Sequence, residues 1–244
     1  MSSFDRVAEI YDATRSLPRP VMESIVDGIE AFVGRSGVVD IGVGTGRFAA
    51  PLTERGVDVV GLDISLPMLR QARAKGVPGL VIASAESAPF RQRTFDYAMV
   101  VHFMHLLRDW RSAVGEISRV ARRGLITVVG DSEGSHPRDL YIRLRESRGF
   151  KMAGLRMGER EMVGMVEPAV ARRLVSYRDE FDPAALLDEY SAKLHSITWD
   201  VPDDVNSQIV AEMRRLLGEK REVERSATLV VWERDQLRGF HPSP

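Results

Sequence analysis

Three glycines and two aspartates are the residues of this sequence whose types and spacing point most directly to chemistry. The stretch VVDIGVGTGRFAA, residues 38–50, places Gly42, Gly44 and Gly46 on alternate positions after an apolar run that includes Asp40. Glycines permit positive φ angles and carry no Cβ atoms, so a ligand can approach the main chain there, and the helix that follows offers free amide groups. The alternative is a tight glycine turn that binds nothing.

The second aspartate, Asp63, ends the next apolar run in VDVVGLDIS. A carboxylate at a strand end can accept hydrogen bonds from both hydroxyls of a ribose, as a nucleoside ligand requires. Asp63 could instead cap the helix that begins near Ser65, although Ser65 fills that role better. The spacing G-x-G-x-G has Arg47 where a dinucleotide fingerprint has its third glycine, so a pyrophosphate site fits poorly.

Regular elements must hold these residues in place, and the apolar pattern predicts them. Continuous apolar runs rich in valine and isoleucine predict strands that are buried on both faces. These runs span residues 37–41, 57–62, 79–83, 97–101 and 125–130. Helical periodicity occurs over residues 21–33, 48–55, 65–75 and 110–121. Strand followed by helix, repeated, predicts an α/β fold with a doubly wound parallel sheet.

The alternation of strand and helix changes after residue 130. Further helical stretches are predicted over residues 137–148, 159–173, 184–194 and 203–218, and further strands over residues 174–181 and 227–233. The late helices are more than the sheet needs for cover. We therefore expect some of them to form a lid over the carboxyl edge of the sheet.

Composition narrows the class of protein. The chain has 244 residues, of which 44% are hydrophobic, and a formal net charge of -1, which suits one globular domain of the larger sort. It has no cysteine, which excludes disulfides, thiolate chemistry and Cys-based zinc or iron–sulfur sites; we predict no metal. The 34 basic and 35 acidic residues are interspersed, which argues against a nucleic-acid partner. With no membrane span and no targeting signal in view, we expect a cytoplasmic protein without a membrane partner.

Four motifs in order give the chain a family resemblance. VVDIGVGTGRFAA, VVGLDISLPMLRQAR, ASAESAPF and TFDYAMVVHFMHLLRDW resemble the successive motifs of class I S-adenosylmethionine-dependent methyltransferases. The resemblance is strongest to the group similar to the ubiquinone and menaquinone biosynthesis methyltransferases, methyltransferase type 11, and covers about residues 4–130. It implies a Rossmann-like sheet of seven strands whose last strand, here residues 227–233, is antiparallel. It also implies S-adenosyl-L-methionine as the cofactor.

The resemblance implies a role for each residue of the first two motifs. Asp40 and the glycines Gly42, Gly44 and Gly46 would surround the methionine part of the cofactor. Asp63 would bind the ribose hydroxyls.

Residues of the adenine region and of the N-terminus also receive roles from the resemblance. Ile64 would cover one face of the adenine, and Ser84, Ala85 and Glu86 would close over its edge. Relatives usually have an aspartate where Ser84 stands, but a hydroxyl can still accept a hydrogen bond from the adenine amine. Glu86 could also be only a solvated acid or an acid at the start of a helix. Tyr11 would fold over the cofactor, or pack in the core as an amphipathic ring.

Several polar residues at the predicted sheet edge are candidates for proton transfer. His102, in VVHFMHLL, should lie at the rim near the reactive methyl group, where it lines the pocket, acts as a base or simply packs. His105, three residues later, should lie deeper and serve packing or local hydrogen bonding. If the acceptor has a proton to lose, the candidate bases are His102, Tyr11, Asp131 and His136.

We therefore predict transfer of a methyl group to a small-molecule acceptor by direct in-line displacement. The alternatives are a non-catalytic S-adenosylmethionine-binding sensor or accessory subunit and, disfavoured by the glycine spacing, a nicotinamide-dependent oxidoreductase. The chain is expected to form a single methyltransferase domain with four parts. These are an N-terminal helical cap (1–35), a cofactor-binding core (36–130), a late strand with lid helices (131–220) and a final strand with a tail (221–244). The sequence predicts neither the acceptor nor the oligomeric state.

Overall fold

Two units make up the fold of this chain. The computed structural model describes residues 5, 8–9, 11–12, 17–107, 109–133, 137–150, 158–217 and 222–240. Contacts between residues assign Met1–Gly130, Arg156–Val175 and Ala227–Pro244 to the first unit, and Asp131–Leu155 and Ser176–Ser226 to the second. The predicted end of the cofactor-binding core at residue 130 coincides with a unit boundary. The single domain stays a prediction.

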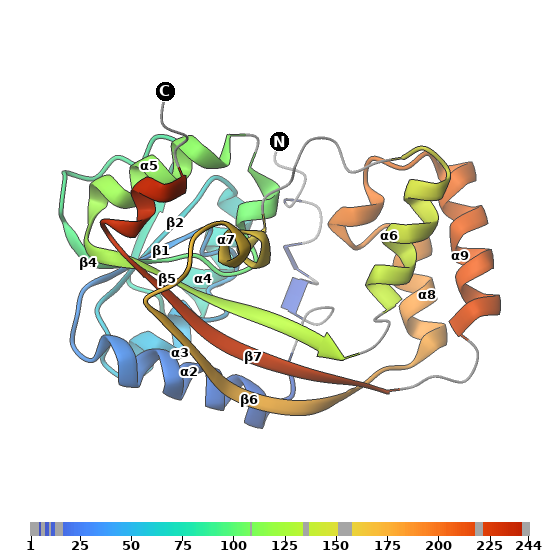
Figure 1. Ribbon diagram of the computed structural model, residues 1–244, viewed down its shortest axis with the longest axis horizontal. Coiled ribbons are helices and arrows are strands. Elements are labelled where there is room, and N and C mark those ends of the chain that lie inside the picture. Colours follow the sequence, from blue (N-terminus) through green and yellow to red (C-terminus); the bar gives the residue numbers. More distant parts are fainter. Residues whose placement is uncertain are drawn as a thin grey trace. The chain divides into compact units, whose positions relative to one another are not determined.

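A sheet of seven strands has the order β3-β2-β1-β4-β5-β7-β6 (Figure 1). The strands are β1 Val38–Ile41, β2 Val59–Asp63, β3 Gly79–Ile82, β4 Phe95–Met99, β5 Ala121–Glu133, β6 Val170–Glu180 and β7 Glu222–Glu233. Parallel pairing joins β1 to β2 and β4, β2 to β3, and β4 to β5. β5 passes from the first unit into the second, whereas its neighbour β7 passes from the second into the first, so these two strands are antiparallel. The predicted mostly parallel sheet and its antiparallel final strand are confirmed.

Helices of the first unit turn one apolar face toward the sheet. They are α2 Arg19–Val33, α3 Ala49–Glu54, α4 Leu66–Ala74, α5 Trp110–Val120 and α7 Glu159–Met165, with 3-10 turns η2 Met104–Leu106 and η4 Gln236–Phe240. In α5 the buried residues Trp110, Ala113, Val114 and Ile117 recur at the spacing of one helix face. All four residues of β1 are buried, as expected for a central strand that is covered on both sides.

Side-chain caps mark where two of these helices begin. The Ser65 hydroxyl accepts a hydrogen bond from the Met68 N–H at 3.4 Å at the start of α4. The Asp109 carboxylate accepts from the Ser112 N–H at 3.1 Å at the start of α5. Each cap satisfies an amide that has no partner within its helix, so the predicted Ser65 cap is confirmed.

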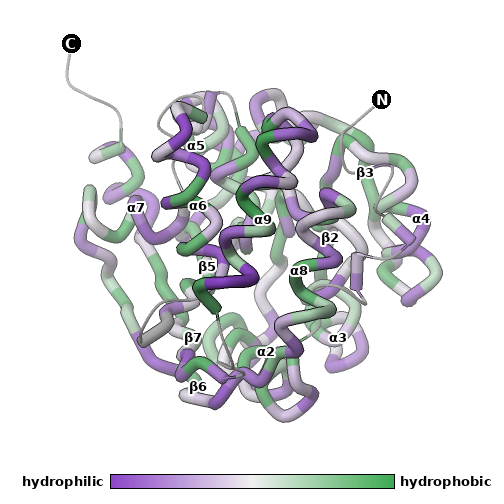
Figure 2. Tube along the Cα trace, turned by 90° about the vertical axis from the view of Figure 1, so that its right-hand side faces the viewer, coloured by the Kyte–Doolittle hydropathy of each residue, from purple (hydrophilic) through white to green (hydrophobic). Residues whose placement is uncertain are grey.

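The second unit has its own apolar core. Its helices are α6 Pro137–Ser147, α8 Pro183–Ser191 and α9 Asp203–Leu217, with the 3-10 turn η3 Ser196–Thr198. Hydrophobic and hydrophilic stretches alternate along α9 (Figure 2), and its buried residues include Ile209, Val210 and Met213. In the same core the Tyr141 hydroxyl donates to Asn206 Oδ1 at 2.6 Å. Burial of that hydroxyl raises the pKa of Tyr141 to about 12.

The length and composition of the helices decide whether one of them could cross a membrane. The buried residues of α2 include Val21, Ile25 and Ile29, at helical spacing, and α2 has 15 residues, as many as α9. Among the described residues, no helix is both long and apolar enough to cross a membrane.

Most predicted elements lie within a few residues of the observed ones, but the helix predicted over 159–173 is wrong. α7 ends at Met165, and β6 begins at Val170. Pro168 disfavours helical backbone in the residue before it, and Val166 is already extended, with φ -133° and ψ 120°. The predicted strands 125–130 and 227–233 are shorter than β5 and β7, because both strands continue through polar residues that break the apolar run.

Candidate functional site

The turn after β1 is built from glycines in left-handed conformations. Gly42, Gly44 and Gly46 have φ angles of 77°, 53° and 74°. A Cβ atom on Gly42 would lie 2.3 Å from Cδ2 of Phe103, so the Phe103 ring packs directly on this glycine. A Cβ atom on Gly44 would meet nothing nearer than 3.9 Å. The turn therefore has one glycine covered by an aromatic ring and one whose α-carbon faces open space.

Asp63, the last residue of β2, closes this turn. Its Oδ2 accepts a hydrogen bond from the Gly44 N–H at 2.9 Å, and its Oδ1 accepts from the Ser65 N–H at 2.8 Å. Burial raises the pKa of Asp63, and the backbone N–H groups act in the opposite direction. A carboxylate offers about four acceptor positions, so Asp63 can accept a further donor besides these backbone N–H groups. Asp63 therefore lies at the glycine turn. The cap of the following helix is provided by Ser65 rather than by Asp63.

Asp40 is the most deeply buried acid of the site. It lies in β1 with 4% of its surface exposed. Burial, and after it the charge of Asp63, raises the pKa of Asp40 to about 7. A cation beside a buried carboxylate favours its ionised form and offsets the effect of burial. Asp40 is therefore suited to hold an ammonium group.

Two exposed isoleucines flank Asp63 at the ends of β2 and β3. Ile64 is 64% exposed and Ile82 is 58% exposed. The strand register pairs Asp63 with Ile82, and the Ala83 N–H donates to the Asp63 carbonyl at 3.1 Å. Sequence reasoning singled out Ile64 but missed Ile82, which resembled one more core residue of an apolar strand. Both are exposed apolar residues next to Asp63, Ile64 along the chain and Ile82 across the strand pair.

The turn after β3 contains the three residues expected at the edge of the adenine. Ser84 is partly buried, and its hydroxyl accepts from the Glu86 N–H at 3.2 Å. Ala85 is 3% exposed. Glu86 is exposed, and its carboxylate accepts from the Asp109 N–H at 3.2 Å. Glu86 thus also ties this turn to the start of α5.

His102 follows β4 and has an unusual backbone. Its φ angle is +56°, which L-residues rarely adopt, and its side chain is exposed. The next residue, Phe103, carries the ring that covers Gly42. His105 lies in η2 and is only partly buried. The segment after β4 therefore brings an exposed histidine to the neighbourhood of the glycine turn.

Residues near the N-terminus contact the same turn. The Asp12 carboxylate accepts from the Thr45 hydroxyl at 2.7 Å and pairs with Lys75. The Asp5 carboxylate accepts from the Ser65 hydroxyl at 2.7 Å. Tyr11, next to Asp12, is partly buried. Sequence reasoning found Tyr11 but missed both aspartates, whose contacts are with distant parts of the chain.

Asp131 and His136 are the two candidate bases that follow the first-unit part of β5 in the sequence. Asp131 is exposed and belongs to the second unit, at the end of β5. His136 lies outside the described residues. The roles of all these candidates in catalysis or cofactor binding stay predictions.

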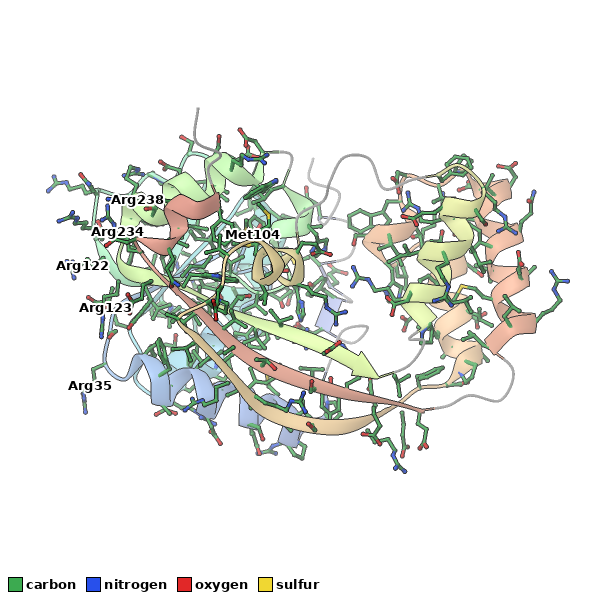
Figure 3. All side chains as sticks on the ribbon, viewed as in Figure 1. Arg35, Met104, Arg122, Arg123, Arg234 and Arg238 are labelled. Atoms are coloured by element: carbon green, nitrogen blue, oxygen red, sulfur yellow. The ribbon has the colours of Figure 1, made fainter. Side chains whose placement is uncertain are left out.

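A row of arginines lies along one side of the first unit, at the amino ends of β4 and β5. The arginines labelled in Figure 3 are Arg35, Arg122, Arg123, Arg234 and Arg238. Acids accompany them, because Arg122 pairs with Asp96 at 3.3 Å and Arg238 pairs with Asp235 at 3.6 Å. The glycine turn lies at the other, carboxyl end of the strands. The absence of a nucleic-acid partner stays a prediction.

Comparison with known proteins places the chain in a family. Residues 39–129 match the model of a methyltransferase domain. An uncharacterized methyltransferase of Mycobacterium bovis is 30% identical over 191 residues, which cover 74% of this chain and 73% of that protein. A demethylmenaquinone methyltransferase of Renibacterium salmoninarum is 31% identical over 140 residues, which cover 55% of this chain and 58% of that protein. For this relative and two others, the match spans only 25% to 61% of the relative's own length.

The fold has solved counterparts. The crystal structure of an S-adenosylmethionine-dependent methyltransferase from Thermotoga maritima, described as a possible histamine N-methyltransferase, has a TM-score of 0.53 and 19% sequence identity. The match covers 95% of this chain and 98% of that protein. At this identity the likeness concerns the fold alone. The family model, the long match to the mycobacterial relative and the shared fold agree, and the chain belongs to the class I S-adenosylmethionine-dependent methyltransferases.

Proposed function

We propose that this protein binds S-adenosylmethionine and transfers its methyl group to a small-molecule acceptor by direct in-line displacement. The observation that carries the proposal is the Asp63 carboxylate, which accepts from the N–H of Gly44, whose α-carbon faces open space. Exposed isoleucines lie next to Asp63 in the chain, at Ile64, and opposite it in β3, at Ile82. An adenosyl group needs such an arrangement: a paired acceptor for the ribose hydroxyls, an apolar face for the base and a backbone without side chains. The residues present therefore fit the cofactor.

Each part of the cofactor then has a partner in the first unit. Asp63 accepts from the ribose hydroxyls, while Ile64 and Ile82 pack against the adenine. Ser84 meets the edge of the adenine, next to the buried Ala85 and to Glu86. The open surface at Gly44 admits the methionine part, whose ammonium group approaches Asp40.

Methyl transfer makes modest demands on the protein. The sulfonium methyl group of the bound cofactor is electrophilic, so a lone pair on the acceptor forms the new bond to carbon while the bond between carbon and sulfur breaks. The side chains have to align the acceptor and exclude water. An acceptor that loses a proton also needs a base, and His102 and Tyr11, in the first unit, are our candidates. The exposed His102, beside the glycine turn, is the first to test.

A small molecule is the proposed acceptor. The demethylmenaquinone methyltransferase among the relatives has a small molecule in its name. Asp5 and Asp12 accept hydrogen bonds from Ser65 and Thr45, which supports a position for Tyr11, next to Asp12, over the cofactor. A ring in that position would help to exclude water from the reacting groups.

Binding and transfer are tested separately. Thermal unfolding and calorimetry with S-adenosylhomocysteine are expected to show stabilisation and saturable binding, because a ligand of the native state raises its stability by mass action. NAD is the matched control and should have no effect. Stabilisation by NAD alone would contradict the proposal in favour of a nicotinamide-dependent oxidoreductase.

Incubation with methyl-labelled donor and a panel of small hydroxyl, amine and acidic-carbon acceptors tests the reaction. Label in an acceptor supports the enzyme. Tight binding of S-adenosylhomocysteine with no transfer to any member of a broad panel would favour the non-catalytic sensor or accessory subunit.

Asp40 gives the proposal a pH dependence. Its pKa is raised from 3.8 to about 7 in the folded protein. Protonation of Asp40 is favoured in the folded state and therefore stabilises the ligand-free protein. This stabilisation is complete below pH 3.8 and is lost as the pH rises through about 7. An ammonium group binds the ionised form, so affinity for S-adenosylhomocysteine should fall by up to about tenfold per pH unit below 7. Calorimetry between about pH 6 and 8 measures this slope.

Asp40→Asn is the matched variant for that slope. Asparagine has nearly the same shape and does not titrate, so its affinity should be lower at about pH 8 and nearly constant down to about pH 6. Without ligand, the variant should also lose less stability than the wild type as the pH rises through about 7. Parallel pH profiles for the two proteins would show that Asp40 does not meet the ammonium group.

A further inference from the structure

A buried glutamate lies at the start of α7. Glu159 is the first residue of this helix and is 7% exposed. Glutamate is rarely buried to this extent unless it is paired or hydrogen-bonded. Burial raises the pKa of its carboxyl, and hydrogen bonds from backbone N–H groups act in the opposite direction. The hydrogen-bond partners of Glu159 therefore indicate what its buried carboxylate does.

Those partners are the amides that follow His102. Glu159 Oε1 accepts from the Phe103 N–H at 2.7 Å and from the Met104 N–H at 3.1 Å. Figure 3 shows Met104 beside α7. These amides lie beyond the end of β4, where the ladder of hydrogen bonds between strands has ended. The Glu159 carboxylate accepts their hydrogen bonds instead. One oxygen thus holds two consecutive peptide groups.

The held segment is the one that forms the rim of the proposed cofactor site. His102 has a left-handed backbone, which is costly for a residue with a side chain and persists only where its surroundings hold it. Phe103 covers Gly42 in the glycine turn. Glu159 therefore secures both the backbone of an exposed histidine and the ring that packs on the turn.

The neighbouring residue of α7 fastens a second strand end. The Arg160 guanidinium donates to the Gly130 carbonyl in β5 at 2.9 Å. The first two residues of α7 thus bind the segment after β4 and the end of the first-unit part of β5. All these groups belong to the first unit.

We propose that Glu159 is a positioning residue for methyl transfer, which fixes the segment His102–Met104 so that His102 and Phe103 keep the geometry needed at the methyl end of the cofactor. This inference rests on the proposed function. Glu159 itself touches neither cofactor nor acceptor and acts through the two backbone amides. Loss of its carboxylate should therefore impair binding through His102 and Phe103.

The test compares Glu159→Gln with Glu161→Gln. Both variants remove one negative charge from α7, but Glu161 is exposed and its carboxylate accepts from the Gly158 N–H instead. We expect Glu159→Gln to weaken S-adenosylhomocysteine binding about tenfold and to speed amide hydrogen exchange at Phe103 and Met104. Glu161→Gln should match the wild type in both measurements. Glu159→Asp, which keeps the charge but shortens the reach, should fall between the wild type and Glu159→Gln.

A double-mutant cycle with His102→Ala separates positioning from simple loss of stability. If Glu159 acts through His102, the combined loss of affinity in His102→Ala/Glu159→Gln is smaller than the product of the single losses. A combined loss equal to the product of the single losses would overturn the inference, and so would wild-type affinity in Glu159→Gln. Absence of binding in the wild type would instead contradict the proposed function, so the two failures are distinguishable. If Glu159→Gln does not fold, Glu159→Asp provides the same cycle.

Discussion

Asp63→Ala is expected to lower the affinity for S-adenosylhomocysteine about 100-fold. Hydrogen bonds to a charged group contribute about 1.5–3 kcal/mol each, and the proposed site uses this carboxylate for both ribose hydroxyls. A combined loss of about 3 kcal/mol corresponds to about two orders of magnitude in Kd. Calorimetric titration of the purified variant measures the effect.

The control for this prediction is a second carboxylate that also holds a glycine amide. Asp96 Oδ2 accepts from the Gly37 N–H at 3.1 Å, much as Asp63 Oδ2 accepts from the Gly44 N–H. Asp96 lies near the amino end of β4, away from the turn. Asp96→Ala should lose stability comparable to Asp63→Ala but bind S-adenosylhomocysteine like the wild type. Equal affinities for the two variants would contradict the role given to Asp63.

The central part of the fold was predictable because its strands are buried on both faces. Such strands are continuous apolar runs, and a run like that of β1 can hardly be placed anywhere but in a core. The seven-stranded arrangement itself came from the family resemblance rather than from the runs. Predictions were weaker for β6, which alternates between exposed and partly buried residues. An edge strand of this kind gives no apolar run to detect.

The candidate site was predictable to the extent that it is local in sequence. The glycine turn, Asp63 and the segment after β3 each show themselves in a few consecutive residues. The hydrogen bonds that join these segments to the rest of the chain leave no such local pattern. Asp12 reaches Thr45 across 33 positions, and Glu159 reaches Phe103 across 56. An acid of this kind has no local pattern that distinguishes it from a solvated one, so only the fold reveals it.

Gly42→Ala is expected to lower the free energy of unfolding by about 3 kcal/mol, the sum of a backbone cost and a packing cost. The left-handed backbone at φ 77° costs an alanine about 1–2 kcal/mol. The new methyl group would also lie 2.3 Å from Cδ2 and 2.4 Å from Cγ of Phe103, and forced overpacking typically adds about 1–3 kcal/mol. Chemical denaturation followed by tryptophan fluorescence measures the loss.

Two other glycines separate the contributions to that loss. Gly56 has φ 84° and no atom within 4 Å of the place where an alanine methyl group would lie, so Gly56→Ala carries the backbone cost alone, about 1 kcal/mol. Gly44→Ala should cost about as much in stability, because its methyl group also has room, yet it should weaken S-adenosylhomocysteine binding. A loss in Gly42→Ala no larger than that in Gly56→Ala would show that the Phe103 ring gives way. The contact through which Glu159 is proposed to reach the turn would then be too soft to transmit its effect.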